Sequence, residues 1–149
     1  MSNCCSANPS TITTQPCAQC GAICRSVEMR TVYLQLRFPE NQAVTPDHYF
    51  FCPAKTCSIG YFSTAGNIIP SLHLKSHHDI QQDRLCYCFD IDATDYVDAL
   101  RANRAEAIKD FVIQRTKSGE CACEITNPSG LCCLAKFKLL NQQYRSKLV

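Results

Sequence analysis

The chain has 149 residues, which is enough for one ordinary domain or two very small ones. Its 15 basic and 13 acidic side chains nearly balance, so charge alone gives no reason to expect a nucleic-acid or membrane surface. No apolar run approaches the ~20 residues that a membrane-spanning helix needs, and we expect no membrane insertion. The sequence has no tryptophan but 13 cysteines, and the cysteines therefore carry most of its information.

Many cysteines are also typical of secreted disulfide scaffolds. Residues 1–9, however, lack the basic start and apolar run of a signal peptide. The cysteine count is odd, and the cysteines fall in close-set pairs, which suit a shared metal better than long-range bridges. We therefore expect reduced, metal-binding thiols in a cytoplasmic protein.

The first half of the chain is predicted to be rich in strands. Residues 1–16 are rich in Ser, Thr, Asn and Pro and are expected to form a flexible lead. β-branched and aromatic residues predict strands over 27–38, 48–52 and 57–62, with 67–69 as a continuation.

The second half is predicted to be helical. Residues 71–84 hold three of the four histidines and little apolar pattern, and are expected to be a linker. Apolar residues at helical spacing predict three helices. The first is capped by Thr94, the second covers 105–117, and the third runs from about Leu131 to the end. Gly119 closes the second of these.

These patterns predict an α+β protein of two modules. A small β-rich zinc-binding module over 17–70 is followed, after the linker, by a helical module over 85–149 that binds an iron–sulfur cluster. The assignment of the two centres depends on two sets of cysteines.

The first set has the spacing of a thiolate zinc site. Cys17 and Cys20 are separated by two residues and followed by Gly21, which permits a tight turn behind the two sulfurs. Cys52 and Cys57 come from the tips of the aromatic strands. Four thiolates suit zinc in a structural role, because they leave no open position on the metal.

Three other interpretations of this set remain open. The two pairs could be unrelated surface cysteines, or His48 could replace one of the ligands. Zinc ribbons also bind nucleic acid, but the flanking residues here do not form a basic stripe. Cys24 is close to the first pair and is expected to be a small buried thiol.

The second set suggests an iron–sulfur cluster. In extended backbone Cys86 and Cys88 lie on the same face, so both sulfurs can reach one iron. The second set has six cysteines, and a cluster needs four ligands. The side chains of the adjacent cysteines at 132 and 133 diverge, so we expect only one of them to face the cluster. A second zinc is the alternative. The other candidates are Cys121, Cys123, Cys132 and Cys133.

Together these motifs resemble a known family. The run Cys123-Glu-Ile-Thr-Asn-Pro-Ser-Gly-Leu-Cys132-Cys133, with the segments 49–62 and 85–89, resembles the amino-terminal domain of CopZ-type copper chaperones. The resemblance implies a zinc module followed by a 2Fe–2S unit similar to bacterioferritin-associated ferredoxin. Carried over by position, it implies Cys86, Cys88, Cys123 and Cys133 as cluster ligands, with Cys132 as second choice and Cys121 not required.

The resemblance also implies a function. The fused chaperones continue into a copper domain with a Met-x-Cys-x-x-Cys loop, which is not found before Val149. We therefore expect an accessory protein that transfers single electrons, reducing Cu(II) to Cu(I). It would act beside a separate copper carrier or metal-transporting ATPase and take electrons from an unidentified donor.

Two alternatives to this function remain. The protein could be a passive thiol-rich metal-binding module, or a zinc-only interaction module without redox chemistry. Copper is expected to bind only transiently, and extra soft-metal ligands are Cys4, Cys5, Cys121 and Cys132. The linker histidines His73, His77 and His78 are expected to be solvated rather than to bind Cu(II).

Overall fold

The first half of the chain forms an antiparallel sheet. The computed structural model describes residues 14–147. The five strands follow one another across the sheet in chain order, so each pairs with its neighbours in sequence. The other connections in the sheet are short, whereas the one between β2 and β3 holds a helix. The strands are β1 (Thr14–Pro16), β2 (Ile23–Val27), β3 (Tyr49–Phe51), β4 (Ile59–Ser63) and β5 (Ile68–Pro70).

One helix completes the core of this sheet module. Helix α1 (Met29–Gln35) follows β2 almost directly, and Leu36 at its end pairs with Leu74 across an isolated bridge. Two 3₁₀ turns, η1 (Glu40–Gln42) and η2 (Ser71–His73), lie in the connections. The most buried side chains of this core are Val32, Leu36, Tyr49, Tyr61 and Leu74.

The second half consists of a hairpin and helices around a separate core. Tyr96 and Phe137 meet edge to face, with ring centroids 4.8 Å apart, and Val112 packs in the same cluster. Cys86 and Cys133 belong to this core as well. The elements are α2 (His77–Gln81), β6 (Arg84–Cys86), β7 (Ile91–Asp92), α3 (Ala93–Arg101), α4 (Ala105–Lys117), α5 (Cys123–Thr126) and α6 (Leu134–Lys147).

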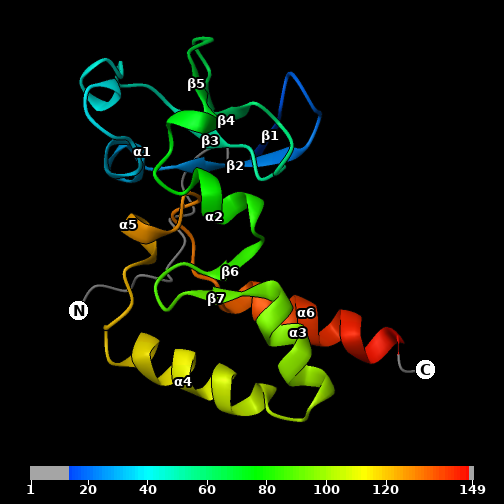
Figure 1. Ribbon diagram of the computed structural model, residues 1–149. Coiled ribbons are helices and arrows are strands. Elements are labelled where there is room, and N and C mark those ends of the chain that lie inside the picture. Colours follow the sequence, from blue (N-terminus) through cyan, green and yellow to red (C-terminus); the bar gives the residue numbers. More distant parts are fainter. Residues whose placement is uncertain (1–13, 148–149) are drawn as a thin grey trace.

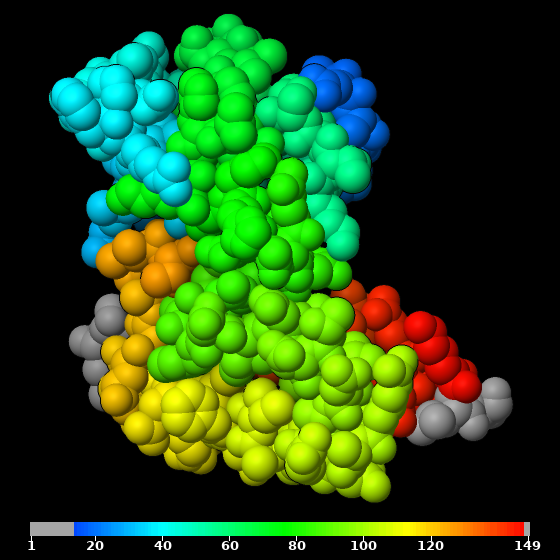
Figure 2. Space-filling view, viewed as in Figure 1, coloured from blue at the N-terminus to red at the C-terminus, as the bar shows by residue number. Residues whose placement is uncertain are grey.

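The two cores lie at opposite ends of the molecule. Strands β1–β5 and α1 occupy one end, helices α3, α4 and α6 the other, and α2 and α5 lie between them (Figure 1). At the surface, the segment around α5 (orange) lies between the sheet module and α4 (yellow), and α6 (red) projects to one side (Figure 2). None of the helices within residues 14–147 has the length and hydrophobicity needed to cross a bilayer.

The predicted fold class is confirmed. The structure is α+β, with a β-rich amino-terminal module and a helical module after it. The helix predicted over 105–117 has the bounds of α4, and Gly119 follows it with a positive φ of 71°. The segment predicted as a strand over 48–52 contains β3, and those over 57–62 and 67–69 cover β4 and β5 except for the last residue of each.

The strand predicted over 27–38 is wrong beyond its first residue. Val27 ends β2 opposite Tyr49, and residues 29–35 form α1. The β-branched and aromatic content of this segment favours a strand, but its buried residues Thr31, Val32 and Gln35 share one face of a helix. Burial of that face overrides the local propensity.

Five smaller differences concern the bounds or the presence of elements. Residues 14–16 of the predicted flexible lead form β1, while residues 1–13 lie outside the described residues. The segment predicted as linker, 71–84, contains η2 and α2 and buries Leu74. Helix α3 has its N-cap at Asp92 instead of Thr94. The last helix begins at Leu134 rather than Leu131, and the single turn α5 was not predicted.

The helical core gives a direct test of how α6 is packed. Phe137→Ala removes a completely buried ring that contacts Tyr96, so the free energy of unfolding should fall by about 3–5 kcal/mol. Leu139→Ala, on the exposed side of the same helix, is the matched control and should change stability by less than about 0.5 kcal/mol. Denaturant unfolding measures both, and equal losses would contradict this packing of α6.

Candidate metal centres

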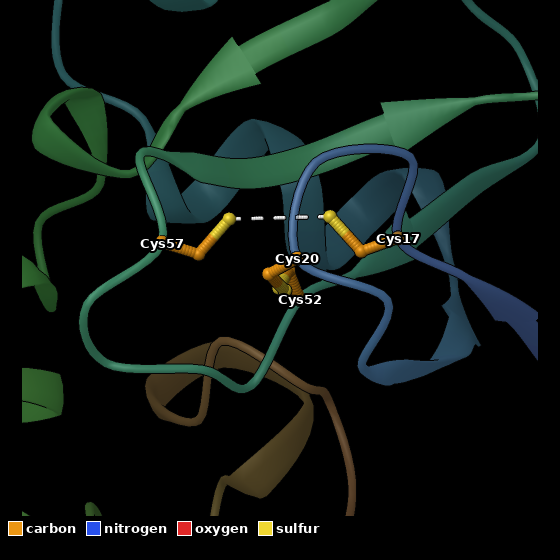
Figure 3. A group of neighbouring side chains, drawn as sticks. All are labelled: Cys17, Cys20, Cys52 and Cys57. Atoms are coloured by element: carbon orange, nitrogen blue, oxygen red, sulfur yellow. Dashed lines mark hydrogen bonds between the residues drawn. The ribbon is translucent and has the colours of Figure 1, made fainter.

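Four cysteines of the sheet module converge on one point. Their Sγ atoms all lie within 4.8 Å of one another, with Cys17 and Cys57 3.9 Å apart and Cys20 and Cys52 3.5 Å apart. Figure 3 shows the four side chains pointing inward from two facing loops. All four residues predicted as zinc ligands are therefore brought together.

The loop after β1 places the first two sulfurs. It closes with hydrogen bonds from the Gly21 N–H to the Cys17 carbonyl and from the Cys17 N–H to the Ala22 carbonyl, both 2.8 Å. Gly21 has a φ of +77°, which a glycine adopts without strain. Cys20 is thereby held at the tip of the loop, facing the second pair.

The connection between β3 and β4 places the other two sulfurs. Cys52 follows β3, and its N–H donates to the Gly60 carbonyl at 2.9 Å. Cys57 precedes β4 and its N–H donates to the Ala54 carbonyl at 3.2 Å. Because β3 and β4 are paired in the sheet, the two cysteines return to the same end of it.

Three of the four sulfurs belong to buried residues, and this affects their ionisation. Burial would raise the pKa of the Cys17 thiol, but hydrogen bonds from the backbone N–H groups of Cys20 and Gln19 lower it to about 7. Burial raises the pKa of Cys52, whereas Cys20 is exposed. Full ionisation of four crowded thiols therefore calls for a cation, and the all-sulfur donor set fits Zn²⁺.

The neighbouring residues considered as substitute ligands have other roles. His48 Nε2 lies 2.8 Å from Ser26 Oγ, and its ring stacks on Phe50 at a centroid distance of 4.7 Å. The Cys24 thiol donates to the Ala22 carbonyl at 3.2 Å, and burial raises its pKa to about 11. Both residues are packed beside the site, and Cys24 is the small buried thiol that was predicted.

A second group of sulfurs lies between the β6–β7 hairpin and the segment that leads into α6. Cys88 Sγ is 3.6 Å from Cys123 Sγ, and the Cys133 thiol hydrogen-bonds to the sulfurs of both Cys123 and Cys86. The four sulfurs thus form a connected chain, in the order 86, 133, 123, 88. Cys86, Cys123 and Cys133 are buried, and Cys88 is half-buried.

The contacts within this group pair residues of different elements. Cys86 ends β6 and contacts Cys133, which directly precedes α6, whereas Cys88 contacts Cys123, the first residue of α5. The sequence had predicted that Cys86 and Cys88 share one face of extended backbone. The structure instead connects each of them to a partner in the later segment.

Hydrogen bonds among these thiols shift their pKa values in opposite directions. Hydrogen bonds from the Cys133 and Cys88 thiols lower the pKa of Cys123 to about 3. The Cys133 thiol likewise lowers the pKa of Cys86 to about 7, against the effect of burial. Donation to these two partners raises the pKa of Cys133 itself. Two sulfurs therefore exist readily as thiolates while the donors remain protonated.

The remaining candidate cysteines are placed differently. Cys132 is half-buried, while its neighbour Cys133 is 3 % exposed and lies in the core. Cys121 is half-buried and disulfide-bonded, which departs from the expected reduced thiol. Cys4 and Cys5 lie outside the described residues. Among residues 14–147, no cluster of three or more metal-ligating side chains includes the linker histidines.

The sequence analysis missed the polar contacts that join the two modules. Thr31 Oγ1 donates to the Glu124 carbonyl at 2.7 Å, and Gln35 Nε2 donates to the carbonyl of Ile125 at 2.8 Å. Both donors lie on α1, and both acceptors lie in α5. The sequence feature that could have indicated these contacts is the pair Thr31 and Gln35, which lie four residues apart on the buried face of a helix beside Val32.

The four-thiolate site on a small antiparallel sheet defines the first module as a zinc-binding domain. The family model zf_CopZ, described as "Zinc binding domain", matches residues 14–75. A solved structure, the CopZ N-terminal domain of Archaeoglobus fulgidus, matches with a TM-score of 0.64 and 21% sequence identity, over 85% of this chain and 98% of that chain. A comparison with curated proteins found no match.

These findings confirm the predicted resemblance. Residues 14–75 match the zinc-binding domain model, and the chain as a whole has the fold of the solved CopZ N-terminal domain. The solved relative, at 21% identity, supports the fold alone.

The geometry of the first site predicts what a single ligand change does. Cys17→Ser removes one of four thiolates, so zinc affinity should fall by more than the roughly 10–100-fold typical of changes outside the ligand shell. Bound zinc should drop from about one per chain, and the free energy of unfolding should fall, because metal binding is coupled to folding. Any iron chromophore should remain.

Cys24→Ala is the matched control, because Cys24 is equally buried but donates to a carbonyl. It should retain zinc, as elemental analysis of chelator-free preparations can establish. Zinc loss in the control but not in Cys17→Ser would contradict the assignment, and loss of zinc and iron together would show that the centres are not separable.

Proposed function

We propose that this protein is a zinc- and iron–sulfur-containing accessory protein for the handling of copper or another soft metal. In this proposal Cys17, Cys20, Cys52 and Cys57 hold a structural zinc. Cys86, Cys88, Cys123 and Cys133 hold a 2Fe–2S cluster. The match of residues 14–75 to the zf_CopZ zinc-binding domain supports a role in metal handling.

The observation that carries the redox part is the second group of sulfurs. Four thiolates are the usual ligand set of a 2Fe–2S cluster, which transfers one electron at a time. The four sulfurs form one connected chain, so all four can serve one small cluster. Within the described residues, only the first set has all its ligand atoms within 4.8 Å of one another, so the second set is the more open of the two.

The protein groups around the second site have definable roles. The Ala122 N–H donates to Cys88 Sγ at 3.1 Å and stabilises negative charge on that sulfur, and the Thr126 Oγ1 lies at the same distance. Hydrogen bonds to ligand sulfurs are one of the means by which proteins set a cluster's potential. Cys88 is the only half-buried member of the four and gives the shortest route to the surface.

The expected reaction is the one-electron reduction of Cu(II) to Cu(I). The reduced cluster would lose one electron to the copper ion and regain it from a separate donor. The Cu(I) would then pass to a separate copper carrier or metal-transporting ATPase. Ten of the described cysteines are free thiols, which suits the reducing conditions of the cytoplasm.

Colour distinguishes this function from its two alternatives. Protein prepared without oxygen should be red-brown, should contain about two iron and two acid-labile sulfide per chain, and should bleach with dithionite. Re-oxidation by one equivalent of Cu(II) should restore the colour. A colourless protein with two zinc ions would instead indicate a zinc-only interaction module, and coloured protein that does not react with Cu(II) would exclude copper reduction.

Single serine replacements test the choice of cluster ligands. Cys86→Ser, Cys88→Ser, Cys123→Ser and Cys133→Ser should each lose or shift the chromophore, because each removes one sulfur of the connected chain. Cys132→Ser is the matched control next to Cys133 and should keep the chromophore, as should Cys121→Ser. Iron and sulfide analysis measures the result. Retention in Cys133→Ser with loss in Cys132→Ser would reverse the assignment at this pair.

A further inference from the structure

Helix α1 of the zinc-binding module holds the backbone that carries two of the second group's cysteines. Glu124, Ile125 and Thr126 are three of the four residues of α5, and the backbone carbonyl of each accepts a hydrogen bond from a side chain of α1. Thr31 Oγ1 donates to the first of these, and Gln35 Nε2 donates to the other two, at 2.8 and 3.2 Å. These contacts bridge about 90 residues of sequence.

The contact continues into the turn after α5. The Tyr61 hydroxyl, which belongs to the sheet core, donates to the Pro128 carbonyl. Gly130 lies against Thr31 so closely that a Cβ atom there would be 2.9 Å from the threonine Oγ1. Within the turn, Asn127 Oδ1 accepts from the Ser129 N–H at 2.9 Å. Pro128 and Gly130 of the Asn-Pro-Ser-Gly run therefore contact the first module, while Asn127 and Ser129 hydrogen-bond to each other within the turn.

The Gln35 amide has its orientation fixed by its partners. The residue is 2 % exposed, and while its Nε2 donates to α5, its Oε1 accepts from the Ser76 hydroxyl at 2.7 Å. Reversing the amide would place an acceptor against two carbonyls, so only one orientation satisfies the site. Gln35 thus links α1, the segment before α2 and α5.

Helix α5 depends on such contacts, because it consists of one turn. A single turn has little stability of its own, and its last carbonyls have no partner within the helix. Cys123 is the first residue of α5, and the turn that follows leads directly to Cys133. Any fraying of α5 would move both sulfurs.

We propose that Gln35, Thr31 and Tyr61 are positioning residues that hold the segment 123–133, and with it Cys123 and Cys133, in place. The zinc-binding module is then the template on which the second site is assembled. The part of this inference that concerns iron rests on the proposed function. The part that concerns the segment does not.

Hydrogen exchange in iron-free, zinc-loaded protein tests the segment directly. The amides of Ile125, Thr126 and Asn127 are hydrogen-bonded only while α5 is formed. Thr31→Val is isosteric but has no donor, and should speed their exchange about tenfold, the equivalent of one hydrogen bond of about 1.4 kcal/mol. Thr31→Ser keeps the hydroxyl and should restore slow exchange.

Two further variants complete the test. Gln35→Glu has the same shape but replaces a donor by an acceptor, so exchange and the rate of Cys123 alkylation should both rise by at least tenfold. Arg30→Gln is the control, because its 3.5 Å ion pair with Glu124 is exposed and surface pairs contribute little. Zinc content reports whether the first module is intact, and if Gln35→Glu does not fold, the Thr31 pair decides.

The loaded protein supplies a readout that general loss of stability would not change. In reconstituted Thr31→Val protein the cluster should show an altered spectrum and potential, which Thr31→Ser should return to the wild-type values. Wild-type exchange and alkylation rates in both Thr31→Val and Gln35→Glu would overturn the proposal. A wild-type protein that takes up no iron would refute the proposed function, while the exchange data would still decide whether α1 holds the segment.

Discussion

The approach of four sulfurs at the end of the sheet is the constraint on which the first module depends. β1, β3 and β5 have three residues each, so the sheet alone offers limited burial. The loops at this end are closed by a few backbone hydrogen bonds and by the convergence of Cys17, Cys20, Cys52 and Cys57. Crowded thiolates repel one another unless a cation neutralises them. A metal ion held by these four thiolates would tie the β1–β2 loop to the β3–β4 connection, so ligand geometry and sheet register would support each other.

In the helical module, unlike the sheet module, two of the clustered cysteines belong to the main hydrophobic core. Cys86 and Cys133 pack in the same cluster as Tyr96 and Phe137, whereas Cys17, Cys52 and Cys57 lie in a separate cluster with Phe50. The β6–β7 hairpin that carries Cys86 is anchored by Arg84. That guanidinium contacts Asp79 at 3.2 Å and Asp92 at 2.7 Å, and also contacts Asp90. A rigid hairpin on one side and α5 on the other confine the sulfurs between them.

The sequence predicted what spacing and periodicity encode locally. The Cys-x-x-Cys-Gly loop, the aromatic strands and the helix over 105–117 required only neighbouring residues, and their outlines hold in the structure. Helix α1 was predicted as a strand because Thr31, Val32 and Tyr33 favour extended backbone, and only contact with α5 and the sheet core makes a helix of them. The exposure of Cys20 and the contacts of Cys88 with Cys123 and of Cys86 with Cys133 also arise from tertiary packing, so no local pattern contained them.

The contacts at the junction of the two modules explain the residue types of the most specific motif in the sequence. Asn127-Pro128-Ser129-Gly130 is the run on which the family resemblance chiefly depended, yet none of its side chains is a metal ligand. Asn127 fixes the turn through its own side chain, Pro128 presents its carbonyl to Tyr61, and Gly130 gives room for Thr31. Each residue type follows from how closely this turn approaches the first module. The motif therefore forms the joint between the two modules, and Cys123 and Cys133 lie on either side of it.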